Sequence, residues 1–209
     1  MNIPILHEDE WLLIVDKPSG LLVIPTPRNE KRTLSSILNE DARNKDRHYR
    51  LRPCHRLDKE TSGAIIYAKG KAIQKKMIEL FKKRGISKTY IAFALGNFTR
   101  QGGEIRIPLE EKIAITKYKL IENRKEFSIL EVRPVTGRTN QIRIHFKSIG
   151  HPLLGETKYA FRKDQPFKTK RLYLHAKALE FIHPVTKKLI KVDTGLAKDL
   201  KDLLNQYPK

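Results

Sequence analysis

The chain has 209 residues, and its 43 Lys and Arg against 23 Asp and Glu give a formal net charge of +20. Such an excess indicates a polyanionic partner, most often nucleic acid. An anionic membrane surface is the weaker alternative, because no basic amphipathic helix with exposed aromatic residues is expected. Hydrophobic residues make up 39% of the chain, which excludes a disordered protein. The single cysteine, Cys54, excludes an intrachain disulfide and a cysteine-based metal site.

The N-terminal residues lack the charged and apolar zones of a signal peptide. The apolar run at residues 11–15 is far shorter than the roughly 20 residues that span a bilayer. We therefore expect a cytoplasmic protein with no membrane partner.

The first predicted elements alternate between strands and helices. Residues 11–16 and 21–24 are expected to form a short hairpin with its turn at residues 18–20. Thr33 or Ser35 is expected to cap a helix that ends near residue 42. The later predicted elements are a buried strand at 63–68, an amphipathic helix at 70–84 stopped by Gly85, strands at 90–95, 116–121 and 127–133, a helix at 139–149 capped by Thr139, a hairpin of 172–182 with 189–193, and a terminal helix at 196–207.

Strands outnumber helices in this prediction, and a helix does not follow every strand. The pattern favours an α+β fold with a mixed, mostly antiparallel sheet flanked by helices and loops, in a single domain over residues 1–209. One face of the 70–84 helix carries basic side chains. That face is either solvated or in contact with a polyanion, and these residues are Lys71, Lys75, Lys76, Lys82, Lys83 and Arg84.

Three segments contain side chains that suit chemistry. In residues 54–63, Asp58 stands beside Arg56 and Lys59, which favour the ionised carboxylate. It precedes a Thr-Ser-Gly turn and a buried strand, a place that suits a nucleophile or a base. Read locally, however, the segment favours a plain turn cap, in which Asp58 accepts from the amides of Thr61 or Ser62.

The second segment runs from Thr136 to His145, where Arg143 would lie one turn inside a helix. A guanidinium there can form a defined ion pair with a carboxylate, although Arg138 and Arg143 could also be plain surface cations. The third segment contains Tyr90, whose ring could stack on a nucleobase or simply pack in the core.

Metal and nucleotide motifs are missing from the sequence. None of the seven histidines has a partner at metal-ligand spacing, and no glycine-rich phosphate-binding loop is present. We therefore expect neither a metal nor a cofactor.

Taken together, these segments resemble the RluA family of pseudouridine synthases. The signature is His55-Arg56-Leu57-Asp58-x-x-Thr61-Ser62-Gly63, which is long and unusual. Further segments match in the expected order, and they are Asp16-Lys17-Pro18-x-Gly20, Lys88-x-Tyr90-x-Ala92, Gly137-Arg138-Thr139-x-Gln141-Ile142-Arg143-x-His145, His151-Pro152-x-x-Gly155-x-x-x-Tyr159, Leu174-His175-Ala176 and His183-Pro184-x-Thr186.

The resemblance implies an isomerase that converts specific uridines of folded ribosomal or transfer RNA to pseudouridine without a cofactor. It implies that Asp58 is the nucleophile, at the sugar C1′ or the base C6, that Arg143 pairs with it, and that Tyr90 packs on the target base. Arg56 would fill the gap that the flipped nucleotide leaves. The matched motifs imply further residues that bind RNA or assist base flipping, and these are His55, Arg138 and Lys17.

Two departures from the family pattern stand out. The family usually has His where this chain has Asn140, which removes any role for a histidine there. Many relatives carry an N-terminal S4-type RNA-binding domain, and here the motifs begin within the first twenty residues, so we expect none. A monomer satisfies every requirement of this reading.

Two other functions compete with the isomerase. A non-catalytic RNA-binding protein on a synthase scaffold would explain the basic composition, but not the presence of Asp58. A hydrolytic nuclease would need clustered carboxylates to hold divalent metals, and Asp58 has only Glu60 nearby.

Overall fold

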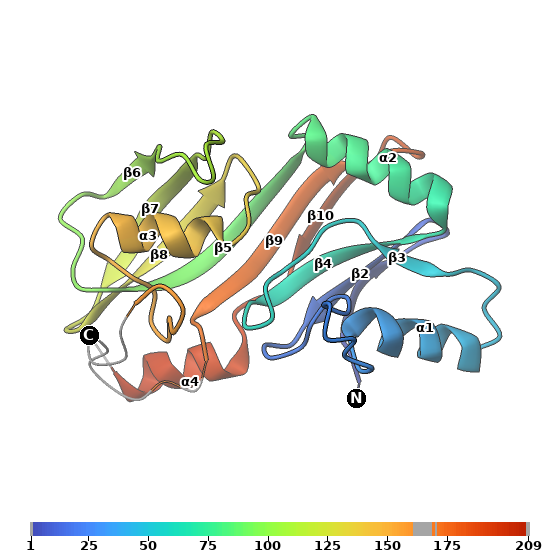
Figure 1. Ribbon diagram of the computed structural model, residues 1–209, viewed down its shortest axis with the longest axis horizontal. Coiled ribbons are helices and arrows are strands. Elements are labelled where there is room, and N and C mark those ends of the chain that lie inside the picture. Colours follow the sequence, from blue (N-terminus) through green and yellow to red (C-terminus); the bar gives the residue numbers. More distant parts are fainter. Residues whose placement is uncertain (1, 161–168, 170, 208–209) are drawn as a thin grey trace. The chain divides into compact units, whose positions relative to one another are not determined.

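The computed structural model describes residues 2–160, 169 and 171–207. Within these residues it has ten strands and four helices, and the strand pairs in each unit are antiparallel (Figure 1). The predicted α+β class is confirmed. None of the helices in the described part of the chain is long and apolar enough to cross a membrane.

The chain folds into two compact units, each built from separate stretches of sequence. Unit 1 comprises Met1–Ser87 with Ala178–Thr194, and unit 2 comprises Lys88–Lys177 with Gly195–Lys209. Strand β5 (Ile86–Leu95) and strand β9 (Leu174–Ile182) each run from one unit into the other. The expected single domain over residues 1–209 stays a prediction.

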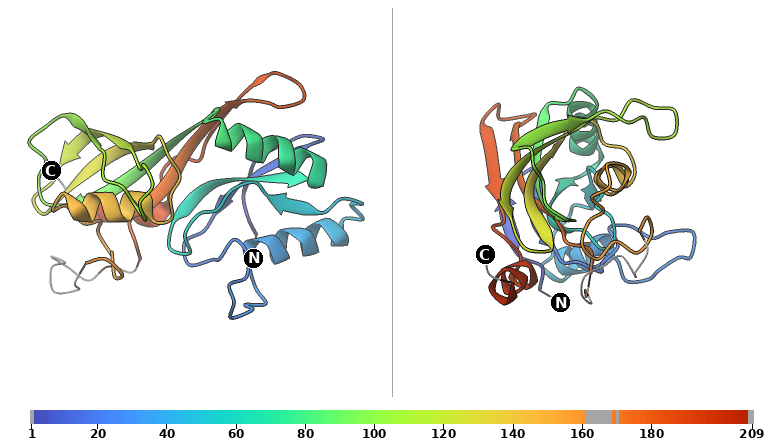
Figure 2. Two further views of the ribbon diagram at one scale, coloured as in Figure 1. Left: turned by 45° about the horizontal axis from the view of Figure 1, so that its top comes forward. Right: turned by 90° about the vertical axis from the view of Figure 1, so that its left-hand side faces the viewer.

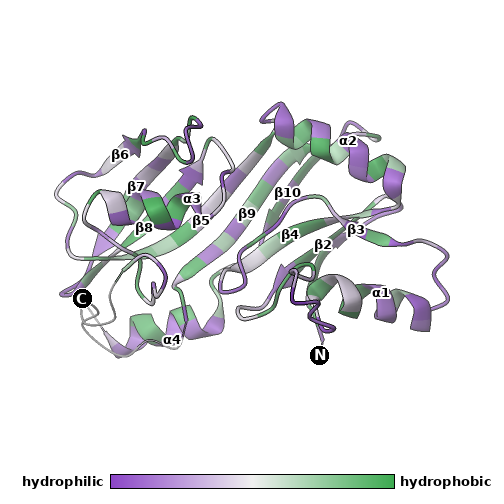
Figure 3. Cartoon of the chain, viewed as in Figure 1, coloured by the Kyte–Doolittle hydropathy of each residue, from purple (hydrophilic) through white to green (hydrophobic). Residues whose placement is uncertain are grey.

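Unit 1 is built on a ladder of four strands and a hairpin. In the ladder, β2 (Leu12–Lys17) pairs with β1 (Ile5–Glu8) and with β4 (Ser62–Lys69), and β4 also pairs with the short β3 (Leu51–Pro53). The hairpin joins β9 to β10 (Leu189–Asp193), as predicted. Helix α2 (Lys71–Lys82) buries Met77 in a core with Ile14, Ile66 and Phe181. Its outer face is strongly hydrophilic (Figure 3).

Helix α1 (Leu34–Asn44) begins at a complete capping box. The Thr33 side chain accepts from the amide of Ser36, and the Ser36 hydroxyl accepts in return from the amide of Thr33. The predicted Thr33 cap is therefore confirmed. The capping box provides hydrogen-bond acceptors for two amides that the start of a helix otherwise leaves unsatisfied.

The predicted hairpin of 11–16 with 21–24 is wrong. Strand β2 pairs instead with the preceding β1, through a turn in which Asp9 accepts from the amides of Trp11 and Leu12 at 2.8 and 2.7 Å. The carbonyls of Leu22 and Val23 accept from the first amides of α1, so residues 21–24 form no strand. An apolar run does not distinguish these two uses of its backbone.

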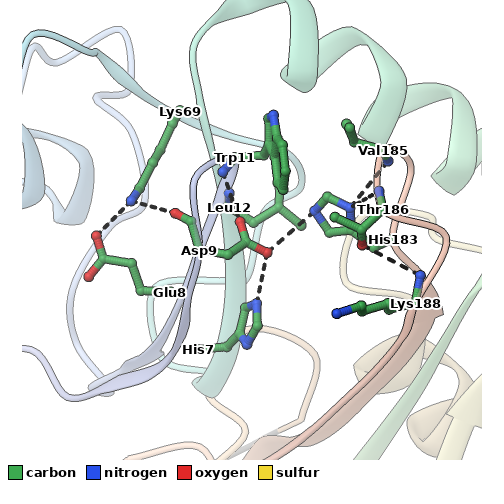
Figure 4. A network of polar contacts seen from close by, with 10 residues as sticks. All are labelled: His7, Glu8, Asp9, Trp11, Leu12, Lys69, His183, Val185, Thr186 and Lys188. Carbon is green, nitrogen blue, oxygen red and sulfur yellow. Dashed lines mark hydrogen bonds and ion pairs between the residues drawn. The ribbon is translucent and has the colours of Figure 1, made fainter.

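A polar network at the β1–β2 turn joins this turn to the β9–β10 hairpin (Figure 4). Asp9 contacts His7 at 3.0 Å and the buried His183 at 3.4 Å. His183 Nδ1 accepts from the amides of Val185 and Thr186, so this nitrogen carries no proton. Burial lowers the pKa of His183, and Asp9 only partly opposes this effect.

Unit 2 is a sheet in the order β5, β8 (Phe127–Pro134), β7 (Thr116–Asn123) and β6 (Gly102–Ile105). Side chains of β5 alternate between two cores. Ala92 and Ala94 pack with α3 (Gln141–Ser148), and Ile91 and Phe93 pack with α4 (Lys198–Gln206). The two helices therefore cover opposite faces of this sheet, as Figure 2 shows.

Candidate active site

Asp58 lies half-buried in the loop that connects β3 to β4 in unit 1. Hydrogen bonds continue the β3–β4 ladder into this loop, from the amide of Cys54 to the carbonyl of Ile66 at 2.9 Å and from the amide of Ile66 to His55 Nε2 at 3.1 Å. The Thr61 amide donates to the main-chain carbonyl of Asp58 at 3.1 Å. The backbone on both sides of the carboxylate is thus fixed by two main-chain hydrogen bonds and by one bond to the His55 ring.

A buried lysine holds the same loop from the side. Lys17 is 0% exposed, and its Nζ donates to the carbonyls of Pro18, Leu21 and Lys59 at 2.9, 2.8 and 3.0 Å. The Lys59 carbonyl accepts a second bond, from the amide of Gly20 at 2.8 Å. A buried ammonium is tolerated only where all its protons are used, and three carbonyls meet that need.

The rest of the Lys17 motif completes this attachment. Ser19 Oγ donates to the Glu60 carbonyl at 2.6 Å, and Gly20 has a φ of +84° that suits glycine. Residues 17–20 therefore fix the carbonyls of the two residues that follow Asp58. Lys17 is therefore part of the support of the Asp58 loop, and its expected contact with RNA stays a prediction.

His55 and Arg56 differ in what they expose. His55 Nε2 accepts a backbone amide, so it carries no proton, and the ring lies 4.8 Å from that of Phe81. This arrangement makes His55 part of the loop's support, and its expected contact with RNA stays a prediction. Arg56 is exposed on the loop, two residues before Asp58.

Arg143 is the centre of a buried ion pair in unit 2. Its Nε and Nη2 donate to the two carboxylate oxygens of Glu156 at 2.6 and 2.8 Å, and the two side chains are 7% and 0% exposed. Burial by itself raises the pKa of Glu156, but hydrogen bonds from Arg143 and from the amides of Lys158 and Tyr159 outweigh it, so the pKa is lowered. The guanidinium is held in one plane by a bidentate partner.

Asn140 occupies the N-cap position of helix α3 without a side-chain capping bond, and its side chain contacts Arg143 instead. The expected cap, Thr139, is wrong, because the N-cap position is Asn140 in the left-handed region with φ 53° and ψ 22°. Asn140 Oδ1 accepts from Arg143 Nη1 at 3.2 Å, and its Nδ2 donates to the Tyr159 hydroxyl at 2.8 Å. Asparagine tolerates this backbone conformation better than most residues.

A second network of hydrogen bonds joins the start of α3 to Thr116 and Thr136. Gln141 accepts from the Thr136 hydroxyl at 2.6 Å and donates to Thr116 at 2.9 Å. Thr116 in turn contacts Nδ1 of the wholly buried His145 at 2.9 Å. Burial lowers the pKa of His145, and its bond to the Ile107 carbonyl only partly opposes this effect. His145 is therefore a neutral structural residue at physiological pH.

Tyr90 and Lys88 lie on strand β5 of the same unit. Tyr90 is half-buried, stands opposite Val132 and packs against the α3-side core. Two positions earlier, Lys88 places its Nζ 3.7 Å from the site that a Cβ on Gly137 would occupy, and burial lowers its pKa. Arg138 is exposed, and its Nε donates to the Ile113 carbonyl at 3.2 Å.

The predicted site residues thus form two groups. Asp58, Arg56, His55 and Lys17 belong to unit 1, and Tyr90, Arg138 and Arg143 belong to unit 2. The pairing of Asp58 with Arg143 and the stacking of Tyr90 on a base stay predictions.

Sequence reasoning did not anticipate Glu156. A lone glutamate after Gly155 gives no sign of a buried partner, although its place between the matched Gly155 and Tyr159 was a usable signal. Within the described residues, no group of three or more His, Cys, Asp or Glu could hold a metal ion.

Comparison with known proteins decides the family. Residues 11–148 match the family model described as RNA pseudouridylate synthase. The chain belongs to this family. The resemblance drawn from the motifs around Asp58, Tyr90 and Arg143 is therefore confirmed at the level of family, and the protein is an RNA pseudouridine synthase.

Several curated relatives match nearly the whole chain. RNA pseudouridine synthase YhcT of Bacillus subtilis is 31% identical over 99% of this chain and 72% of its own length. Ribosomal large subunit pseudouridine synthase D of Buchnera aphidicola is 35% identical over 95% and 71%. Dual-specificity RNA pseudouridine synthase RluA of Vibrio cholerae is 32% identical over 87% and 78%.

Solved structures show the same fold. Human RNA pseudouridylate synthase domain containing 4 superposes with a TM-score of 0.82 at 23% identity, covering 97% of this chain and 92% of that chain. The likeness extends over both units, so the mixed, mostly antiparallel fold expected from the sequence is confirmed.

Proposed function

We propose that Asp58 is the nucleophile with which this synthase isomerises uridine in structured RNA. The observation that carries the proposal is the anchoring of its loop, where the carbonyls of Lys59 and Glu60 are fixed by Lys17, Ser19 and Gly20. A carboxylate on a preorganised loop can be held at attack distance from a reacting atom without an ordering cost at the moment of reaction.

The reaction exchanges one glycosidic bond for another. The bond between N1 and C1′ breaks, the uracil turns, and a bond between C5 and C1′ forms. C5 loses its proton and N1 gains one, so no oxidant or energy source is needed. Asp58 attacks either C1′, with uracil as the leaving group, or C6 of the base.

The other proposed roles follow from exposure and support. Arg143, oriented by Glu156 and Asn140, pairs with Asp58 and keeps it ionised. Tyr90 packs on the target uracil. Arg56 is exposed and fills the gap left by the flipped nucleotide, which recovers part of the few kcal/mol that extrusion costs.

Exposed Arg138 is proposed to contact phosphate, and the +20 net charge attracts the RNA independently of its sequence. We assign Lys17 and His55 to positioning of the Asp58 loop. We further propose that the enzyme acts as a monomer, without metal or cofactor, because every assigned role is filled by one chain.

The test replaces Asp58 by Ala and by Asn, and Asp202, an exposed aspartate of α4, by Ala as the control. Each protein is incubated with RNA from a strain that lacks this gene, and pseudouridine is detected by carbodiimide primer extension. We expect the two Asp58 variants to form none and Asp202→Ala to match the wild type. Wild-type yield from Asp58→Ala would end the proposal and favour a non-catalytic RNA-binding role.

The RNA class is also a proposal. The names of the Buchnera and Vibrio relatives refer to the large ribosomal subunit and to dual specificity. We propose ribosomal or transfer RNA as the substrate. Transcriptome-wide pseudouridine mapping in wild-type and deletion strains tests this, and a site lost only from messenger RNA would contradict it.

A further inference from the structure

A groove in unit 1 is lined by four arginines that the proposed mechanism does not use. It has a volume of about 790 Å³ and lies between α1, the segment 45–50 and β3. Arg43 stands near the end of α1, Arg47 and Arg50 follow in the connecting segment, and Arg52 belongs to β3. We call this surface the arginine groove.

The charges of the arginine groove are not balanced by acids. None of its lining residues is Asp or Glu. In the described part of the chain, no ion pair or side-chain hydrogen bond forms at the four guanidinium groups. Lysines close by are paired, since Lys45 contacts Asp41 at 2.9 Å and Lys69 contacts Glu8 at 2.7 Å. Unpaired cations gathered in one concave surface attract an anion strongly.

The floor of the groove is rigid. Asn39 donates to the carbonyls of Ser35 and Leu51 and accepts from the amide of Leu51, and Gln74 donates to the carbonyl of Pro53 at 2.9 Å. These side chains therefore fasten α1 and α2 to β3. A surface fixed in this way binds a ligand without first being ordered.

The rim of the groove suits unstacked bases. His48 is exposed and Tyr49 is half-exposed, and both line the groove beside the arginines. The connecting segment is hydrophilic along its length (Figure 3). Aromatic rings beside cations are the combination by which proteins bind single-stranded nucleic acid, where rings stack on bases and guanidinium groups pair with phosphates.

We propose that the arginine groove binds the single RNA strand that flanks the target uridine. The proposal rests on the proposed function, because it takes the RNA bound at Asp58 as the occupant. Strand β3 leads directly from the groove into the Asp58 loop, and Arg52 precedes Asp58 by six positions. The volume of the groove lies within the range of pockets that hold small ligands.

Two double variants test the groove, Arg43→Gln/Arg47→Gln and Arg50→Gln/Arg52→Gln. The control is Arg100→Gln/Lys201→Gln, which removes the same charge from exposed positions of unit 2. The probe is a fluorescein-labelled oligouridylate, and its affinity is measured by anisotropy over a series of salt concentrations. We expect each groove variant to flatten the log–log salt slope by about 1.4 units, since each phosphate contact on a single strand contributes about 0.7.

Activity on RNA from the deletion strain gives a second readout. The groove does not touch the reacting atoms, so the groove variants are expected to raise KM at least about tenfold and to keep kcat within about twofold. Their melting temperatures should equal that of the wild type, because within the described residues the lost guanidinium groups form no ion pair and no hydrogen bond with the rest of the fold. A loss of kcat with a lower melting temperature would assign these arginines to folding and overturn the proposal.

The remaining outcomes also separate the possibilities. Equal salt slopes for the groove variants and the control variant would overturn the proposal. Competition by polyglutamate that is as strong as competition by unlabelled RNA would also overturn it, because it would indicate an acidic protein partner. If Asp58→Ala stays active while the groove variants lose RNA affinity, the groove stands and the proposed catalysis fails. If Asp58→Ala is inactive and the groove variants bind normally, only the groove proposal fails.

Discussion

Replacing Glu156 by Gln tests how far the site depends on its buried ion pair. Glu156 is 0% exposed and binds Arg143 through two oxygens at 2.6 and 2.8 Å. Gln keeps the volume, and its one oxygen can still accept from the amides of Lys158 and Tyr159. Its amide nitrogen, however, faces a guanidinium donor, and Arg143 loses the bidentate carboxylate that accepts from its Nε and Nη2.

The expected cost follows from that loss. Removing one partner of a buried pair destabilises a protein by about 3–5 kcal/mol, because the remaining charge is left uncompensated. The retained oxygen places Glu156→Gln at about 3 kcal/mol, the lower end of this range. Against a total stability of about 5–15 kcal/mol, such a change is large enough to measure easily.

The assay is equilibrium urea unfolding at neutral pH, followed by far-ultraviolet circular dichroism. The control is Glu180→Gln, which removes a carboxylate that is 49% exposed and lies 3.0 Å from Lys191. An exposed pair of this kind is expected to contribute less than about 1 kcal/mol.

The double variant Arg143→Met/Glu156→Gln completes the test. Removing the guanidinium group as well should restore part of the stability that Glu156→Gln loses, as expected for two residues in direct contact. A loss below about 1 kcal/mol for Glu156→Gln would refute the reasoning, because it would show that Arg143 does not depend on this carboxylate for its charge to be tolerated.

Three more variants probe the features that support the site. Lys17→Met removes one hydrogen-bond donor from three carbonyls, of which only that of Lys59 is known to keep a bond, from the Gly20 amide. We therefore expect a stability loss of at least about 2 kcal/mol with a fall in kcat, and unchanged urea unfolding would contradict the positioning role. The lowered pKa of His183 means that the unfolded chain binds a proton first, so stability should be full above the unfolded value near 6.5 and fall as pH drops below it; His183→Asn, which keeps an acceptor for Thr186, should flatten that dependence in unfolding experiments across the range. Asn140→Ala puts a residue that tolerates the left-handed region less well than asparagine at φ 53°, so it should cost about 1 kcal/mol. Asn140→Gly should fold better than Asn140→Ala. Both variants remove the side-chain acceptor for Arg143 and should lose activity, so equal activity of Asn140→Gly and the wild type would exclude this orienting role.

Elements with a strong local pattern were predictable from the sequence. The apolar spacing of Ile73, Met77 and Leu80 marked α2, and the β-branched run after Gly63 marked β4. The motif around Asp58 identified the family that the comparisons confirm. These features depend on residues close together in the chain, which is where sequence patterns are informative.

The features that escaped prediction depend on distant contacts. The carbonyls of residues 22 and 23 bond to the start of α1, which an apolar run does not reveal. The burial of Lys17 depends in part on the Lys59 carbonyl, 42 positions away, which no local pattern reveals. The burial of Glu156 depends on its ion pair with Arg143, thirteen positions earlier. Neither residue by itself indicates in the sequence that its side chain will be buried.

The division of the chain also limits how this enzyme can be recombined with its relatives. The path passes between the two units after Ser87, after Lys177 and after Thr194. Two of these crossings fall inside β5 and β9, so a chimaera that exchanges one unit must be joined within strands whose ladder bonds and side-chain alternation have to match on both sides. Replacing a single loop, such as the segment at residues 45–50, avoids these junctions, because such a loop lies within one unit and outside the strands.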